Sequence, residues 1–238
     1  MKYINIQDDI MNFKLNEDVI VTIGNFDGLH RMHRLIFHKV QNIAGNSKLK
    51  KVLITFDKKI SDKKDSFAGR ILSPTEFKKR LEKNFEFDYV IELEISKKLI
   101  ETGVDNFLKW LSNNLNVKKI VIGEDFSFGH KAEGKVNDLK KHFGKSNVYV
   151  ETRNGDISSS LVKKALANGE LRKVNFMLVE PIVFVFNDEN KLIFPETAVK
   201  SGTYSFHDLN RLRTFDLDEN RYANNLGDNR IIEVLKIK

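Results

Sequence analysis

An apolar run leads directly into a turn bracketed by glycines in the segment Val19-Ile20-Val21-Thr22-Ile23-Gly24-Asn25-Phe26-Asp27-Gly28-Leu29-His30. The five residues before Gly24 are apolar or β-branched, which is typical of a buried strand. Residues 30–43 then carry apolar side chains at helical spacing. This stretch therefore predicts a strand, a tight turn and a helix, in that order.

The same alternation continues through the first two-thirds of the chain. Further strands are predicted at residues 52–56, 89–91, 119–122 and 148–150, and further helices at 74 onward, 104–115 and 158–168. Ser73-Pro74-Thr75-Glu76 begins the first of these helices with a serine cap, a proline and a glutamate. Strands that alternate with helices predict an α/β fold with a parallel sheet. Ligands of such sheets bind beyond the carboxyl ends of the strands, which points to the loops after Ile23, Phe56 and Ile122.

The pattern changes after about residue 180. Residues 182–186 and 192–194 flank a polar turn and predict a β-hairpin, and residues 203–206 and 231–237 predict further strands. We therefore expect two domains, residues 1–180 with the parallel sheet and residues 181–238 as a small β-rich C-terminal segment.

Composition limits the class of protein. The chain has 238 residues, 41% of them hydrophobic, which is enough to bury a core. It has no cysteine, so disulfides and thiolate metal sites are excluded, and a reducing cytoplasm is the expected location. No apolar run reaches 18 residues, and Asp8 and Asp9 lie where a signal peptide would be apolar. Neither a membrane span nor secretion is expected.

The charge of the chain is basic, with 40 Lys and Arg against 33 Asp and Glu. Residues 38–83 hold thirteen basic and five acidic side chains, a surplus of eight. Such a surplus permits binding of nucleic acid or of an anionic small ligand. A solvated lysine-rich face explains it equally simply, and we prefer that interpretation, so nucleic acid is not the expected partner.

The first turn has the chemistry of an anion site. Gly24 and Gly28 permit a tight turn and close approach of a ligand, and the following helix directs its unpaired N–H groups towards the same place. His30 and His33 are three residues apart, so on a helix they would share a face and donate to one phosphate chain. Alternatively, one histidine caps the helix and the other lies at the surface.

Four segments resemble, in order, the motifs of the bacterial FAD synthetases, a nucleotidyltransferase module usually fused to a riboflavin kinase. Gly24–His33 resembles G-x-F-D-G-x-H-x-G-H, and Val52–Asp57 resembles the second strand of that family. Gly123–Gly129 resembles G-x-D-F-x-F-G, and Ile157–Lys163 resembles I-S-S-T-x-I-R. The resemblance extends over about 170 residues of this 238-residue chain and implies a Rossmann-like nucleotidyltransferase fold.

The implied reaction is transfer of AMP from ATP to FMN, giving FAD and pyrophosphate, with Mg²⁺ accompanying ATP. His30 and His33 would be the catalytic residues that bind the triphosphate and steady the transition state. No metal-ligating side chain is assigned. The implied ATP-binding residues are Gly24, Asn25, Phe26, Asp27, Gly28, Ser158, Ser159, Ser160 and Lys163. An ordinary helix cap explains the three serines equally well.

The loop after residue 122 would bind the flavin. Phe126 and Phe128 flank one residue, so in an extended segment their rings leave the same side and could stack on an isoalloxazine. Core packing is the alternative for this pair. Glu124 and Asp125 would accept hydrogen bonds from the flavin or its ribityl chain, or would act electrostatically on the next helix. Gly129 completes the set of flavin-binding residues.

The chain departs from the family pattern in several places. Met32 replaces the glycine between the histidines, Lys163 replaces an arginine, and residues 58–60 replace P-H-P. The kinase motif G-x-P-T-A-N is missing, and Phe194–Ala198 resembles a decayed trace of it, so residues 181–238 resemble a short remnant of a riboflavin kinase-like domain. We therefore expect an FMN adenylyltransferase without riboflavin kinase activity.

Two other functions remain open at this point. One is a nucleotidyltransferase with another acceptor, such as phosphopantetheine or a choline-type phosphate, which the pair Phe126 and Phe128 argues against. The other is a catalytically impaired protein of the same fold that binds flavin or nucleic acid. Nothing in the sequence indicates an oligomeric state.

Overall fold

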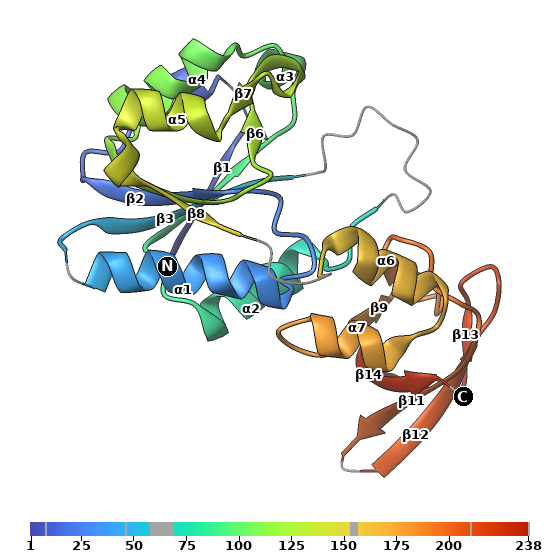
Figure 1. Cartoon of the computed structure of the whole chain (residues 1–238). Coiled ribbons are helices and arrows are strands. Elements are labelled where there is room, and N and C mark those ends of the chain that lie inside the picture. Colours follow the sequence, from blue (N-terminus) through green and yellow to red (C-terminus); the bar gives the residue numbers. More distant parts are fainter. Residues whose placement is uncertain (8, 46, 58–68, 153–156, 210, 238) are drawn as a thin grey trace. The chain divides into compact units, whose positions relative to one another are not determined.

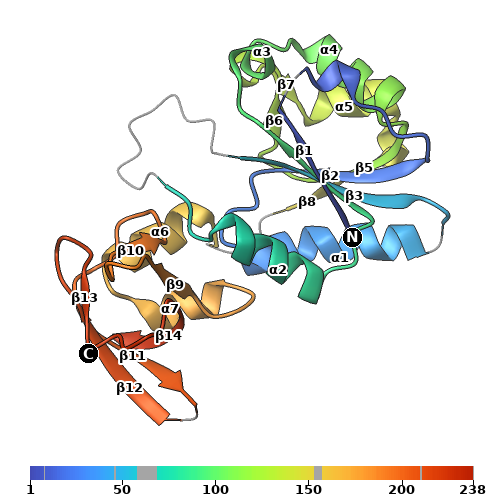
Figure 2. The same ribbon diagram turned by 180° about the vertical axis from the view of Figure 1, so that it is seen from behind.

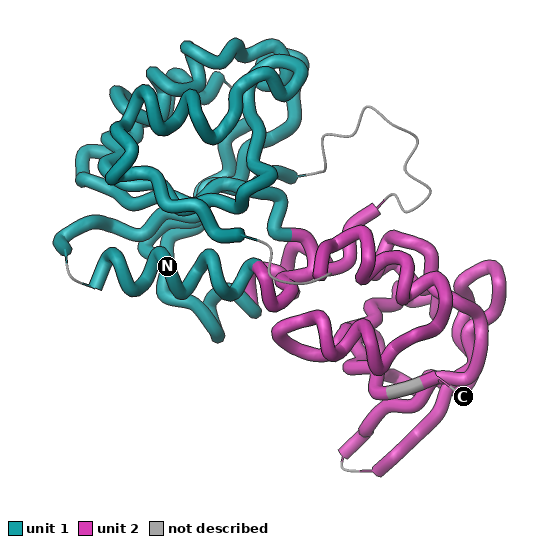
Figure 3. The backbone as a smooth tube through the Cα atoms, viewed as in Figure 1, with its two compact units in different colours: residues 1–26, 33–60, 80–154 teal, residues 27–32, 61–79, 155–238 magenta. Residues whose placement is uncertain are grey.

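The computed structural model describes the whole chain except residues 8, 46, 58–68, 153–156, 210 and 238. Its internal contacts divide the chain into two compact units (Figure 3). Unit 1 comprises residues 1–26, 33–60 and 80–154, and unit 2 comprises residues 27–32, 61–79 and 155–238. The domain boundary expected at residue 180 lies inside unit 2. The turn at residues 27–32 also belongs to unit 2, although it follows the first buried strand directly in the sequence.

Unit 1 is built on a parallel six-stranded sheet. Its strands are β1 (Lys2–Ile6), β2 (Val19–Ile23), β3 (Lys50–Phe56), β4 (Tyr89–Leu93), β5 (Val117–Gly123) and β8 (Val148–Glu151). They lie in the order β1-β4-β3-β2-β5-β8, and every pairing is parallel. All five residues of β2 are buried, as its β-branched run predicts. The predicted α/β fold with a parallel sheet is confirmed.

The strand order determines where a ligand is expected. If β1 is set aside and the other five strands are numbered along the chain from β2, their order across the sheet is 3-2-1-4-5. This is the order of Rossmann-like sheets. The strand order reverses between the neighbours β2 and β5, although both strands run in the same direction. The crevice at the carboxyl ends of these two strands is the usual binding position. Gly24 follows β2 and Gly123 ends β5, so both loops assigned from the sequence begin at this point.

Helices cover both faces of this sheet (Figures 1 and 2). Helix α1 (Arg31–Gly45) runs along one face, and α4 (Val104–Lys109) and α5 (Val136–Phe143) run along the other. The remaining short elements of this part are η1 (Ile10–Asn12), α3 (Lys97–Ile100), β6 (Ser127–Phe128), η3 (His130–Ala132), β7 (Gly134–Lys135) and η4 (Lys145–Asn147). The core between the sheet and α4 includes Trp110, Phe107 and Phe128.

Of the helices predicted from the sequence, one begins as expected and another changes its type before its end. Helix α2 (Pro74–Asn84) begins as expected, and the amide of Glu76 donates to the Ser73 hydroxyl over 3.2 Å. The helix expected over 104–115 is α-helical only to residue 109 and continues as a π-helical turn, η2 (Trp110–Asn114). Asn114 at the end of this wider turn donates to the Met11 carbonyl over 2.6 Å.

Unit 2 combines two helices with an antiparallel sheet. Helices α6 (Ser159–Ala167) and α7 (Leu171–Met177) precede six strands. These are β9 (Val183–Phe186), β10 (Leu192–Phe194), β11 (Gly202–Asp208), β12 (Arg211–Leu217), β13 (Ala223–Asn224) and β14 (Ile231–Ile237). The hairpin of β9 and β10 is confirmed, as are the strands at 203–206 and 231–237.

The antiparallel sheet closes on itself. Its order is β10-β9-β14-β11-β12-β13, and a bridge between Lys191 and Tyr222 joins the two end strands. Leu192 N donates to Arg221 O over 2.7 Å, and Ala223 N donates to Asn190 O over 2.9 Å. The β-rich segment is therefore a small closed barrel. Its interior is aromatic and contains Phe184, Phe186, Tyr204, Phe206 and Phe215.

Among the described residues, none of the helices combines the length and the apolar character needed to span a bilayer.

Candidate functional site

The side chain of Phe26 is buried inside the turn that follows β2. This residue has a positive φ of 48° and is 3% exposed. Its ring covers Gly24 so closely that a Cβ there would lie 3.0 Å from the ring, so any larger residue at this position would have to displace the ring. The Thr55 hydroxyl donates to the Asn25 carbonyl over 3.2 Å. Of the predicted ATP residues, Phe26 thus shapes the turn from inside.

His33 lies on α1 and belongs to an aromatic cluster of unit 1. The edge of its ring meets Phe26 at 5.2 Å between centroids, and it stacks on Phe37 at 6.4 Å. Phe37 is fully buried and contacts Phe85 and Phe87 edge to face. These contacts orient the imidazole of His33 from the core.

Asp27 is the most heavily engaged residue of the turn. Its Oδ1 accepts the Ile71 amide over 2.9 Å, and its Oδ2 lies 3.0 Å from Lys163 Nζ. Its backbone carbonyl accepts the Ser159 hydroxyl over 2.9 Å. Lys163 is 3% exposed and also donates to the Gly69 carbonyl. The sequence assigned the charge of Lys163 to the ATP phosphates, but in the structure this lysine forms an internal ion pair with Asp27 within unit 2.

His30 is buried just outside the first helix, because α1 begins at Arg31. Leu29 before it has a positive φ of 45°, and its carbonyl accepts the Val179 amide over 3.1 Å. His30 itself forms an isolated antiparallel bridge with Leu178. The expectation that His30 and His33 share a helix face is therefore wrong, since strand-like pairing holds His30 before the helix starts.

Gly28 requires its glycine. It has a φ of +79°, and a Cβ there would lie 2.8 Å from the Ile71 side chain. The turn at residues 27–30 thus packs against residue 71.

The three serines at the start of α6 differ in their contacts. Ser158 is the N-cap, and its hydroxyl accepts the Leu161 amide over 3.2 Å. Ser159 donates to Asp27 as described, and Ser160 is exposed. The cap interpretation is thus confirmed for Ser158.

The loop after β5 stacks its two phenylalanines. Phe126 and Phe128 are 5.7 Å apart with an interplanar angle of 20°, so their rings leave the same side as predicted. Phe128 is buried against Phe107 at 5.3 Å, whereas Phe126 is half-buried. Core packing is therefore confirmed for Phe128, whereas Phe126 keeps an accessible surface and its stacking on a flavin stays a prediction.

The remaining flavin candidates flank this stack. Glu124 and Asp125 are exposed, and the Glu124 amide donates to the Glu151 carbonyl over 3.1 Å. Gly129 has a φ of +75°, and a Cβ there would lie 3.1 Å from the Val104 amide nitrogen. The loop can therefore close onto the first turn of α4 only with glycine at this position.

Two of the three departures from the family pattern lie within the described residues. Met32 is 9% exposed in the first turn of α1, and Lys163 forms the ion pair above. Residues 58–60 lie outside the described residues, as does part of the basic stretch 38–83. Within the described part of the chain, no three His, Cys, Asp or Glu side chains gather as a metal site requires.

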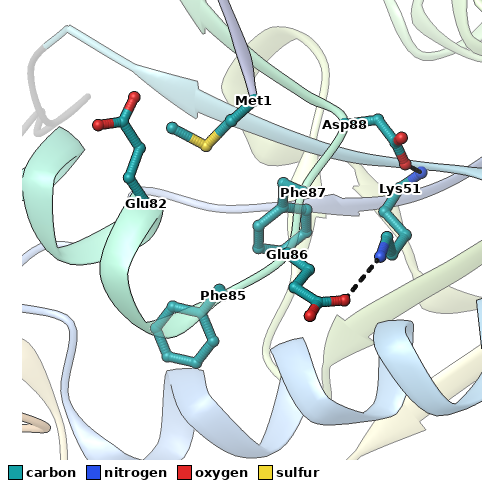
Figure 4. Close-up of a pocket in the computed structure, with 7 residues that line it drawn as sticks. All are labelled: Met1, Lys51, Glu82, Phe85, Glu86, Phe87 and Asp88. Carbon is teal, nitrogen blue, oxygen red and sulfur yellow. Dashed lines mark hydrogen bonds and ion pairs between the residues drawn. The ribbon is translucent and has the colours of Figure 1, made fainter.

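A pocket of about 380 Å³ lies elsewhere in unit 1 (Figure 4). It is lined by Met1, Lys51, Glu82, Phe85, Glu86, Phe87 and Asp88. Met1 precedes β1, Lys51 is the second residue of β3 and Asp88 precedes β4, so the pocket lies at the amino ends of the strands. The candidate residues follow the carboxyl ends, at the opposite edge of the sheet, so this pocket is a separate feature.

Sequence reasoning missed the segment 69–71. It supplies a carbonyl to Lys163 and an amide to Asp27, yet no motif marks it. Gly69 has a positive φ, which glycine adopts readily. In the sequence, however, a lone glycine in a charged stretch is only a weak signal of a functional turn.

Comparison with known proteins gives consistent results for family and fold. A family model described as FAD synthetase matches residues 12–160. A bifunctional riboflavin kinase/FMN adenylyltransferase of Buchnera aphidicola is 28% identical over 226 residues, covering 90% of this chain and 70% of that protein. A protein of the same description from Listeria monocytogenes is 31% identical over 173 residues, covering 68% and 54%.

Two further matches have other descriptions. A Listeria monocytogenes protein described as FAD synthetase is 26% identical over 169 residues, covering 68% of this chain and 69% of that protein. A crystal structure of a macrolide-efflux protein from Streptococcus pneumoniae aligns over 100% of both chains with a TM-score of 0.80 and 20% identity. At that identity the likeness concerns the fold alone.

Proposed function

The chain belongs to the FAD synthetase family of nucleotidyltransferases, and on that premise we propose that it transfers AMP from ATP to FMN, giving FAD and pyrophosphate. The observation that carries this proposal is the position of the two signature loops. Strands β2 and β5 are neighbours at the point where the strand order reverses, and each is followed by one of these loops. A nucleotide site is expected there in a sheet of this order.

The reaction needs alignment and charge neutralisation more than covalent chemistry. An oxygen of the FMN phosphate attacks the α-phosphorus of ATP, and the bond from that phosphorus to the β-phosphate oxygen breaks. Pyrophosphate leaves with the electron pair. We assign the steadying of these oxygens to the imidazoles of His30 and His33. The aromatic contacts of His33 and the burial of His30 limit the freedom of both rings.

The ATP side is assigned to residues 24–28 and to the beginning of α6. Gly24, Asn25 and Phe26 shape the turn, and the amides of the first turn of α6 offer donors to phosphate oxygens. Among the three serines, Ser160 is exposed and assigned to phosphate. The hydroxyls of Ser158 and Ser159 instead form hydrogen bonds with backbone groups. Lys163 acts on this side through Asp27, because their ion pair holds the turn.

The flavin side is assigned to residues 124–129. The accessible face of Phe126 is suited to stacking on the isoalloxazine, and Phe128 supports it from the core. Glu124 and Asp125 are exposed acceptors for flavin or ribityl donors. Gly129 fixes the closure of the loop.

Mg²⁺ is proposed to enter as the ATP complex. Magnesium in such sites is held mainly by substrate phosphates, waters and one or two carboxylates. Its contribution is to neutralise charge on the triphosphate. We also propose a cytoplasmic location, on the basis of the cysteine-free composition.

We propose that residues 181–238 do not phosphorylate riboflavin. The barrel has Pro195-Glu196-Thr197-Ala198 in place of the kinase signature. Residues 1–180 would then hold the adenylyltransferase activity, and the barrel would have another role.

One experiment tests these proposals together. Purified protein is incubated with Mg-ATP and either FMN or riboflavin, and the products are separated by chromatography. We expect FAD and pyrophosphate from FMN, and neither FMN nor FAD from riboflavin. Flavin binding without FAD formation would instead favour an impaired binding protein, for which Met32 between the histidines is the sequence feature. Formation of FMN from riboflavin would contradict the assignment of the barrel.

A further inference from the structure

The turn at residues 27–30 is linked to the barrel by a continuous set of contacts within unit 2. Its first link is the segment 69–71. Ile71 donates its amide to the Asp27 carboxylate over 2.9 Å, and the Gly69 carbonyl accepts Lys163 Nζ. The same lysine holds the other oxygen of Asp27 at 3.0 Å. The conformation of Asp27 is therefore coupled to that of residues 69–71.

The second link joins this segment to the barrel at Glu196. The Arg70 amide donates to Glu196 Oε2 over 2.8 Å, and the Glu196 amide donates to the Arg70 carbonyl over 2.8 Å. Gly69 has a φ of +89°. A Cβ at Gly69 would lie 2.7 Å from the Glu196 Cβ and 3.0 Å from the Thr197 amide nitrogen. The two backbones approach so closely that neither segment can shift independently.

The third link is Arg221, which holds the Glu196 loop in place. Its Nη1 donates to the carbonyls of Thr197 over 2.8 Å and Glu196 over 3.2 Å, and its Nη2 donates to Pro195. Its Nε donates to the Leu192 carbonyl over 3.1 Å. One planar guanidinium thus satisfies the first carbonyl of β10 and three carbonyls of the loop between β10 and β11, which a flexible ammonium group would not do. Burial lowers the pKa of Arg221, and the Glu196 carboxylate opposes that shift.

We propose that the barrel is a positioning module for the nucleotide turn, with Arg221 and Glu196 as its positioning residues. Arg221 fixes the loop at 195–197, this loop fixes residues 69–71, and those residues fix Asp27 beside the buried Lys163. A barrel without the kinase signature then still serves adenylyl transfer. This inference rests on the proposed function, since Asp27 and Gly28 of this turn are assigned to ATP and His30 to its triphosphate.

The test compares steady-state kinetics of variants in the full chain. Arg221→Ala is expected to lower kcat/KM for ATP about tenfold, because small displacements of positioning groups have effects of this order or larger. Glu196→Ala removes one hydrogen bond and should cost about threefold in the same direction. The KM for FMN should not change, because the flavin loop belongs to unit 1 and has none of these contacts.

Conservative and matched variants separate positioning from folding. Glu196→Gln keeps an acceptor for the Arg70 amide and should restore most of the activity that Glu196→Ala loses. Glu219→Ala and Arg211→Ala change exposed barrel residues of the same types and should behave as wild type. Thermal denaturation of each variant reports whether it is folded. If Arg221→Ala does not fold, Glu196→Ala and Glu196→Gln decide the question.

The outcomes distinguish this inference from the proposed function. If the wild-type protein makes no FAD, the proposed function fails and this inference fails with it. If the wild type is active and Glu196→Ala and Arg221→Ala keep the wild-type KM for ATP, only the inference is overturned. A fall in kcat with both KM values unchanged would mean fewer folded molecules and would also overturn it. A raised KM for ATP with rescue by Glu196→Gln supports it.

Discussion

The loop at residues 123–129 and the turn at residues 27–30 are held by different forces. The first is stabilised by aromatic packing, since Phe128 is buried against Phe107 and stacks under Phe126. The second is stabilised by polar contacts, since Asp27 binds Lys163, Ile71 and Ser159. Apolar packing tolerates a few tenths of an ångström of displacement, whereas an ion pair with fixed amides specifies direction. The proposed roles agree with this difference, because phosphate alignment needs direction and a flat ring needs a surface.

The largest effect is expected at the histidines. The double variant His30→Ala with His33→Ala should lower kcat for FAD formation by about a thousandfold or more, the loss seen when transition-state donors are removed. Stopped-time chromatography of FAD measures it. The matched control is His38→Ala with His142→Ala, two exposed histidines, which should keep full activity. Turnover that survives the loss of His30 and His33 would remove them from the mechanism.

The aromatic side of the comparison is tested by Phe128→Ala. Truncating this buried ring should lower the free energy of unfolding by about 3–4 kcal/mol, through lost burial and the resulting cavity. Chemical denaturation measures the change. Phe176→Ala is the control, because that residue is 61% exposed and its ring lies under the Arg31 guanidinium at the surface. A loss of less than about 1 kcal/mol at residue 128 would mean that the loop is not held by packing.

The polar side is tested by Lys163→Met. The change leaves the Asp27 carboxylate without its cation in a mostly buried setting, and about 3 kcal/mol of stability should be lost. Lys164→Met changes the exposed neighbour on the same helix and should have little effect. Thermal and urea denaturation compare the two. Equal stability of both variants would show that the ion pair does not hold the turn.

Phe126→Ala sharpens the comparison by separating binding from packing in one loop. Its ring is half-buried, so stability should change little relative to Phe128→Ala. The KM for FMN should rise about tenfold if a stacking contact worth about 1.4 kcal/mol is lost. The KM for ATP serves as the internal control and should be unchanged. An unaltered KM for FMN would count against stacking of the flavin on this ring.

The smallest effect concerns a partly buried polar contact in unit 1. The hydroxyl of Tyr89 donates to Glu17 over 2.7 Å and lowers the pKa of Glu17 below its ordinary 4.5. A lowered folded-state pKa adds stability above about pH 4.5, and that stability is lost as the pH falls through the folded value. Tyr89→Phe should therefore raise the pKa of Glu17, measured by NMR titration. Tyr149→Phe should leave it unchanged, and a Glu17 pKa that ignores Tyr89 would contradict the assignment.

Much of the fold follows from local patterns, and the exceptions have physical reasons. The buried run at β2 is apolar on both faces, so it identifies a central parallel strand. Strand β1 was not predicted, because it is a short edge strand in which only Ile6 is buried. Strand β12 was also not predicted, because only Phe215 and Leu217 of its seven residues are buried.

Some features of the candidate site also followed from local sequence patterns, and others did not. Phe126 and Phe128 are two residues apart, so their shared side follows from strand geometry alone. The placement of His30 did not follow, because its bridge to Leu178 joins residues 148 positions apart in the sequence. The engagement of Lys163 by Asp27 was likewise invisible, since a lysine at a helix start fits a phosphate as well as a carboxylate.

The sequence by itself determined the parallel α/β sheet, the positions of its two signature loops and the family to which the chain is similar. These features depend on side-chain period, turn residues and short motifs, which are local properties. Only the tertiary structure decided that the β-rich segment closes into a barrel, that residues 69–71 support Asp27, and that Arg221 holds the loop beside them. Those contacts join residues that are distant in the chain, and hydrogen bonds between distant groups depend on a geometry that no local pattern encodes.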